Sequence, residues 1–209
     1  MASSDGNPPD SPVRQQGRVR WRRFAFMLVP ALGVAGSLIG LTAAGALSNS
    51  ISVSGTAFTV TADKLDGGPF EQYGAQISPA GHGPTPVAVS VIGNGTLASL
   101  CQAVSVGPVS LVLRAGGSGT PVSASNLVVA ADHLSGDATF SHIAIGQDAG
   151  SLNVPAGTYP GPTSGGFGES ANHVTITNLN QHTWLTTAGT FKLPGLNLGF
   201  APSSSNSCP

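Results

Sequence analysis

The sequence predicts an all-β fold, an antiparallel β-sandwich or flattened barrel, which follows one apolar helix near the N-terminus. Only 8% of the residues are charged, whereas typical soluble domains have roughly 25%. The chain also holds 29 Gly and 16 Pro, which suits short strands joined by turns better than long surface helices. Apolar residues alternate with small or polar ones in several short stretches, which is the pattern of half-buried strands.

The first 47 residues predict a cytoplasmic tail and a membrane segment. Residues 1–23 are rich in Ser, Pro, Arg and Gln, which is typical of a disordered tail. Residues 24–47 carry no charge and, at about 1.5 Å per residue, would form a helix of about 36 Å, enough to cross a bilayer core of about 30 Å. Four arginines precede this segment and place its N-terminal end in the cytoplasm: Arg18, Arg20, Arg22 and Arg23.

Two fates of the apolar segment remain open. Its length exceeds that of a usual signal-peptide core of about 7–15 residues, which favours a retained signal anchor. The small residues Ala44-Gly45-Ala46 fit a signal-peptidase site, which favours cleavage after Ala46. We therefore expect residues 48–209 to form an extracytoplasmic β-domain, either held at the plasma membrane or secreted.

The charge of the predicted β-domain excludes one class of partner. Residues 1–47 hold five arginines and two aspartates, for a net +3, whereas residues 48–209 hold three basic and seven acidic residues, for a net −4. No cluster of Lys or Arg occurs after the N-terminal segment. Since phosphate binding needs clustered positive charge, we expect no nucleic-acid partner.

The strands are predicted in chain order from their alternation, and the connections from Gly, Pro and Asn. Alternating stretches occur around residues 58–61, 87–91, 109–113, 174–177 and 191–200. Asn94-Gly95 predicts a hairpin turn, and residues 116–121 and 146–168 predict loops. A β-solenoid is the alternative fold, although solenoids repeat every 20–30 residues or so and the clear internal repeat here has a spacing of 69.

That repeat consists of TVTADKLDG, ending at Gly67, and VVAADHLSG, ending at Gly136. We interpret it as one turn built twice, in which the Asp accepts backbone N–H bonds, the Leu reaches the core and the Gly supplies a positive φ. The residues of this motif are Asp63, Leu65, Gly67, Asp132, Leu134 and Gly136. A cation site built from Asp63, Asp66, Asp132 and Asp137 is the alternative; it is disfavoured because Ser135 replaces Asp66 in the second copy and the dense D-x-D-x-D-G loop is absent.

Motifs for catalysis and metal binding are missing from the sequence. There is no G-x-S-x-G, no H-x-H and no H-E-x-x-H. His133 and His142, like His173 and His182, are nine residues apart, and an odd offset places two rings on opposite faces of one strand. We therefore predict no catalytic residue, no metal ligand and no cofactor, and the sequence indicates no particular small-molecule ligand.

The two cysteines, Cys101 and Cys208, can form a disulfide in an exported domain. Such a bond would tie the C-terminal end to the body of the domain. Two free thiols are the alternative.

Several segments resemble an actinobacterial family of exported or membrane proteins of unknown function, whose members are often labelled "cholesterol esterase". They are WRRFAFMLVP, SVSGTAFTVTADKLDGGPFEQYG, LASLCQAV, ATFSHIAIGQDAG and TTAGTFKLPGLNLGF. The resemblance implies a multi-spanning membrane protein as a partner and, because the family also tends to end in Cys, supports the bond between Cys101 and Cys208. It implies no catalytic residue.

Three functions follow from these observations. We expect a cell-envelope β-domain that is structural or binds a partner and is not an enzyme. An esterase acting on lipids, as the family label suggests, is the second hypothesis. A lipid-binding carrier is the third, and it requires an apolar cavity of at least about 300 Å³.

Overall fold

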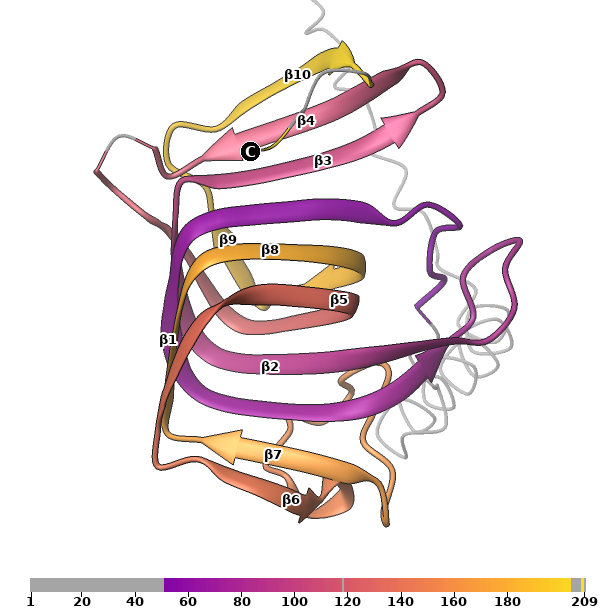
Figure 1. The fold of residues 1–209 in the computed structure, drawn as a ribbon, viewed down its shortest axis with the longest axis vertical. Coiled ribbons are helices and arrows are strands. Elements are labelled where there is room, and N and C mark those ends of the chain that lie inside the picture. The colour runs from indigo at the N-terminus through magenta and orange to yellow at the C-terminus, as the bar shows by residue number, and fades with distance from the viewer. Residues whose placement is uncertain (1–50, 118, 204–207, 209) are drawn as a thin grey trace, which may run out of the picture. The chain divides into compact units, whose positions relative to one another are not determined.

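A computed structural model describes residues 51–117, 119–203 and 208, and within them the fold is all-β with antiparallel pairing, as predicted (Figure 1). The chain divides into two units, Met1–Ser48 and Asn49–Pro209. The second unit contains, in order, β1 (Phe58–Ile77), β2 (Thr85–Ala98), β3 (Leu100–Val106), β4 (Val109–Ala115), β5 (Val122–Ser141), β6 (Ala144–Asp148), the 3₁₀ turn η1 (Ala149–Ser151), β7 (Phe167–Ala171), β8 (His173–Thr187), β9 (Thr190–Lys192) and β10 (Asn197–Pro202).

The predicted cytoplasmic tail and membrane segment lie outside the described residues. No helix among the residues that the structure does describe has the length and hydropathy needed to span a bilayer.

Two 20-residue strands, β1 and β5, each change partners along their length. The first part of β1 pairs with β3 and β8, and its second part pairs with β2 and β7. The first part of β5 pairs with β2, and its second part pairs with β8. The pairing of β1, β2, β5 and β8 therefore closes on itself, and Figure 1 shows β1, β5 and β8 curving together on the left of the view.

Both faces of the central strands are buried. The main core fills the space enclosed by the closed pairing and includes Val60, Leu65, Phe70, Leu127 and Ile176. A second cluster, around Tyr73, Val89 and Ala130, lies on the other face and packs against residues of the connection between η1 and β7. The Tyr73 hydroxyl donates to the Pro160 carbonyl at 2.7 Å, which fastens this connection to β1.

The prediction that the repeated motif forms a turn is wrong. Asp63, Leu65 and Gly67 lie inside β1, and Asp132, Leu134 and Gly136 lie inside β5. Each copy instead marks the place where a long strand passes from one set of partners to the other. The two copies also flank the same strand, because β8 pairs with β1 on one side and with β5 on the other.

The glycines of the motif are required by the close approach of neighbouring strands. A Cβ on Gly67 would lie 2.5 Å from the Asn94 oxygen and 2.8 Å from the Gly95 Cα. A Cβ on Gly136 would lie 2.7 Å from a methyl group of Ile176 and 2.9 Å from the Thr177 oxygen. The leucines differ, since Leu65 is buried and Leu134 is exposed.

The remaining connections agree only in part with the turns and loops predicted from the sequence. Asn94-Gly95 does not form a hairpin turn, because both residues lie within β2, opposite Gly68 and Gly67. The loop predicted at 116–121 does fall between β4 and β5. The loop predicted at 146–168 begins within β6, contains η1 and ends within β7. It is organised by Asp148, whose Oδ1 accepts the N–H groups of Gly150 and Gly165 at 2.8 and 2.9 Å.

Candidate functional site

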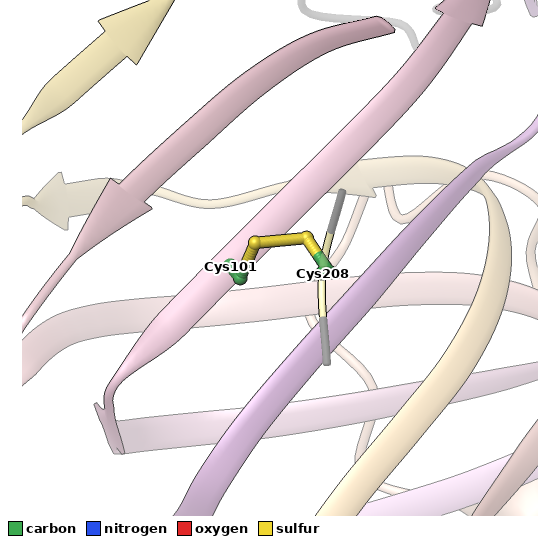
Figure 2. The surroundings of a disulfide bond; sticks show 2 residues. All are labelled: Cys101 and Cys208. Carbon is green, nitrogen blue, oxygen red and sulfur yellow. A yellow bond between two sulfur atoms is a disulfide. The ribbon is translucent and has the colours of Figure 1, made fainter. Parts of the chain in front are cut away.

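The predicted disulfide between Cys101 and Cys208 is present, with the two Cα atoms 5.7 Å apart. Figure 2 shows it joining β3 to the C-terminal end of the chain. Both cysteines are buried with Val112, and Ala103 and Ala201 pack against them. The disulfide therefore holds the C-terminal end against one face of the sheet formed by β3, β4 and β10.

Ser203 joins the same contact. Its N–H donates to the Pro108 carbonyl at 3.0 Å, its hydroxyl donates to the Gly107 carbonyl at 3.1 Å, and it accepts from the Ser110 hydroxyl at 3.4 Å. Because Ser110 and Val112 alternate on β4, one face of this strand is covered by the C-terminal residues.

The opposite face of the same three strands is buried in the main core at one end, at Leu100 and Ala115, and is exposed and apolar at the other. Cross-strand partners in an antiparallel pair project to the same face, and the registers Val106↔Val109, Leu113↔Leu198 and Leu111↔Phe200 therefore place these side chains together. We define the apolar face as its exposed residues, which have exposed fractions between 38% and 75%: Val106, Val109, Leu198 and Phe200. All four side chains are uncharged.

Alternation in the sequence identified residues 196–200 as strand-forming but not as an exposed surface. A period of two tells which side chains share a face, and it does not tell whether another layer covers that face. Whether the face is covered depends on which strands pair, and alternation does not show that β10 pairs with β4 at the end of the sheet.

A polar cluster surrounds Asp132 on β5. Its Oδ1 lies 2.7 Å from the His182 Nδ1, and its Oδ2 accepts the Trp184 Nε1–H at 2.8 Å. The rings of His182 and His82 both meet Trp184 edge to face. Burial opposes ionisation of the Asp132 carboxyl, but the hydrogen bonds from Trp184 and His182 outweigh it, and the pKa of Asp132 lies below its ordinary value.

This cluster holds two members of a Ser-His-Asp arrangement. A carboxylate that accepts from one imidazole nitrogen can orient the ring, so that the other nitrogen acts as a base. Within the described part of the chain, the His182 ring hydrogen-bonds to Asp132 and to no hydroxyl or thiol. The nucleophile of an acyl-transfer site is therefore not assembled there.

The first copy of the motif carries different contacts. Asp63, which corresponds to Asp132, lines an open surface hollow together with Ser99. Asp66 accepts from the Thr175 hydroxyl at 2.8 Å and lies 3.1 Å from the Lys64 Nζ and 3.2 Å from the His173 Nε2. The Thr175 hydrogen bond, with further help from Lys64, holds the pKa of Asp66 below its ordinary value. The repeat is thus not one site built twice.

The interior encloses a small apolar cavity of about 80 Å³. Its lining is mostly aliphatic and aromatic, and polar groups come from Gln72, Ser90, Gln102, Gln181 and Thr186. The Gln72 amide donates to the Ser90 hydroxyl at 2.6 Å. The cavity can hold a few water-sized molecules but not a lipid chain.

One acid is buried on the other face of β1. One oxygen of Glu71, Oε2, has no hydrogen-bond partner among the described residues. Burial raises the pKa of Glu71, although a hydrogen bond with the Asn153 backbone acts in the opposite direction.

Comparison with known proteins identifies a family but no activity. The chain matches no curated protein and no solved structure. The model of DUF6230, a family of unknown function, matches residues 54–209, which include both copies of the repeat and both cysteines. Because this match covers well over half of the sequence, the chain belongs to DUF6230, a family of unknown function.

Proposed function

We propose that the chain is an extracytoplasmic domain of the cell envelope that binds a protein partner and catalyses no reaction. The apolar face of β3, β4 and β10 carries this proposal. Monomeric proteins rarely expose contiguous apolar patches larger than a few hundred Å², and larger ones mark interaction sites. Here four apolar side chains from three adjacent strands, with Phe200 75% exposed, share one face.

An extracytoplasmic location is supported by the disulfide, since such bonds persist in oxidising compartments. In this proposal Arg18, Arg20, Arg22 and Arg23 hold the N-terminal end in the cytoplasm, and residues 24–47 cross the membrane or are removed after Ala46. A phosphatase that folds only outside the cytoplasm, fused after Pro209, should be active, and an inactive fusion would contradict export. The mass of the mature N-terminus distinguishes anchoring from secretion.

An esterase is the second candidate, and the Asp132–His182 pair favours it. An esterase also needs a nucleophile within hydrogen-bond reach of the imidazole. We expect the full chain not to hydrolyse short-chain nitrophenyl esters. Turnover that disappears in His182→Ala but persists in His142→Ala, a matched surface substitution, would establish the esterase and overturn the proposal.

A lipid carrier is disfavoured by the size of the internal cavity. Sites that enclose a drug-sized ligand have volumes of roughly 300–1,000 Å³, whereas the apolar cavity here has about 80 Å³. The larger hollows are open to solvent and have more polar walls.

Partner binding can be tested by placing a photo-crosslinking phenylalanine analogue at position 200 of the full chain in cells. Position 167 is the matched control, because Phe167 is 60% exposed but pairs with Asp148 and lies two residues from Glu169. We expect one defined protein adduct at position 200, lost in the Leu198→Asp variant. Adducts that form equally at both positions, or that survive Leu198→Asp, would contradict the proposal.

A further inference from the structure

The outer edge of β10 is unusual among the edges of this sheet. Exposed edges in natural proteins are protected by charged side chains, Pro, bulges or very short strands. The β6 edge has a register shift after Ile145, a positive φ at Gly146 and a charge at Asp148. The β9 edge has three residues and ends in Lys192.

Residues 197–201 of β10 have none of these protections, and the Pro of this strand is its last residue, Pro202. The stretch Asn-Leu-Gly-Phe-Ala contains no charge and no Pro, and it has no register shift against β4. Within the described residues, β4 is the strand that pairs with β10. This edge is therefore suited to accept one more strand.

The stretch is also complementary to itself. In an antiparallel pair of two β10 strands related by a two-fold axis at Gly199, Leu198 of each copy lies opposite Phe200 of the other. Both pairs then fall on the apolar face, and aromatic–aliphatic cross-strand pairs stabilise sheets by roughly 0.2–1 kcal/mol each. A two-fold interface uses the same patch on both chains, as this arrangement does.

We propose that the protein partner of the apolar face is a second copy of this chain, which pairs through β10 and makes one continuous sheet across the two-fold axis. This inference rests on the proposed function, because it identifies the partner of the same surface. The absence of charge on the face removes the like-charge repulsion that would otherwise oppose association of identical acidic domains.

The area available is consistent with a reversible dimer. With apolar side chains of ordinary size, the four exposed residues present about 400 Å², which is within the roughly 300–600 Å² of the largest apolar patch on a typical monomer, a patch that is often functional. A standard stable interface buries about 800 Å² per partner. The backbone of β10 supplies part of the difference, so we expect a dimer that depends on concentration.

A cysteine at the proposed axis tests the register directly. A Cβ on Gly199 would have nothing within 4 Å, so Gly199→Cys is tolerated. Across the axis the Cα atoms of the two substituted residues would be about 4.5–5.5 Å apart, which a disulfide can bridge. Asn197→Cys is the matched control, because the two copies of residue 197 would be about 13 Å apart at 3.3 Å per residue, too far for a disulfide.

The experiment uses the full chain purified in mild detergent and oxidised gently. We expect Gly199→Cys to give at least tenfold more disulfide-linked dimer than Asn197→Cys, with mass spectrometry identifying a peptide pair joined through position 199 of both chains. Phe200→Asp should reduce this cross-linking at least tenfold, whereas Ile145→Asp, at the protected β6 edge, should leave it unchanged. Any contribution of residues 1–48 to association is the same in all variants.

Equal cross-linking at positions 197 and 199, or none at either, overturns the second copy as partner. The proposed function fails separately. If Gly199→Cys does not cross-link while the photo-crosslinker at position 200 captures a different protein in a manner lost in Leu198→Asp, partner binding stands and self-association is wrong. If Gly199→Cys does not cross-link and the photo-crosslinker at position 200 captures no protein, the proposed partner binding and the proposed self-association are both wrong.

Discussion

Replacement of Gly67 by alanine tests whether the repeated motif marks a crossing of closely approaching strands. The new Cβ would lie 2.5 Å from the Asn94 oxygen and 2.8 Å from the Gly95 Cα. Both atoms belong to the backbone of β2, so neither can rotate away as a side chain could. β2 must therefore move as a strand, although it is held by pairing with β1 on one side and β5 on the other.

The expected cost can be set from this contact. Overpacking of well-packed interiors costs about 1–3 kcal/mol, and immobile backbone places Gly67→Ala near the upper end. For a chain of 150–250 residues, 1 kcal/mol shifts Tm by about 2–4 °C. We expect Tm to fall by about 6–12 °C, measured by circular dichroism on thermal unfolding.

Gly74→Ala is the matched control in the same strand. A Cβ at Gly74 meets nothing within 4 Å, and the position is exposed. Substitution of Gly by Ala at a compatible position stabilises by about 0.4–1 kcal/mol through the unfolded chain. A Gly67→Ala variant with a Tm at or above that of Gly74→Ala would refute the close-approach explanation of the motif.

Three further predictions follow from the cysteines, the buried acid Glu71 and the exposed acid Asp132. Replacement of Cys101 and Cys208 by serine should destabilise the domain by up to about 4–5 kcal/mol on the loop-entropy estimate, which urea unfolding with and without reductant measures. Glu71→Gln should raise Tm at pH 7 but not at pH 4. Because the pKa of Glu71 is raised in the folded state, the domain loses stability as the pH rises above the ordinary pKa of a Glu carboxyl. Equal shifts of Tm at both pH values would contradict this. Asp132→Asn should lower Tm at pH 7 and should lower it less in acid. The lowered pKa of Asp132 means that the ionised carboxylate stabilises the fold at neutral pH and that this stability is lost as the pH falls through the pKa of the folded state. A variant as stable as the parent at pH 7 would show that the hydrogen bonds of Asp132 contribute nothing.

The strands could be predicted from local patterns, but their length and curvature could not. Alternation at Phe58–Thr61 and Val174–Thr177 correctly indicated strands. At Gly67 and at Asn94-Gly95, however, Gly and Asn resemble turn signals but lie where two strands approach closely, at Gly67 and Gly95, which are 28 residues apart in the chain. Gly and Asn favour turns through local backbone preferences, whereas here Gly67 is required because one strand packs closely on another.

The disulfide was accessible from the sequence because only two cysteines exist. The apolar face was not, because Leu198 and Phe200 have the same alternation as buried residues such as Val89 and Val91. The nine-residue spacing of the histidines did not reveal the contact of His182 with Asp132 either. Asp132 lies on β5 and His182 on β8, and the register between these strands is irregular around Ala131 and His133.

The disulfide and the apolar face are two consequences of one arrangement. The sheet formed by β3, β4 and β10 extends beyond the strands that enclose the main core, so each of its faces needs a cover, which the core supplies only in part, at Leu100 and Ala115. Cys208 and Ser203 supply one for the face that holds Val112. The C-terminal end cannot cover both faces while it is bonded to Cys101, and the rest of the other face stays exposed, which is the surface that we propose for a partner. Reduction of the disulfide should therefore expose a second apolar surface and turn a specific association into a non-specific one, so that variants at Phe200 would no longer prevent it.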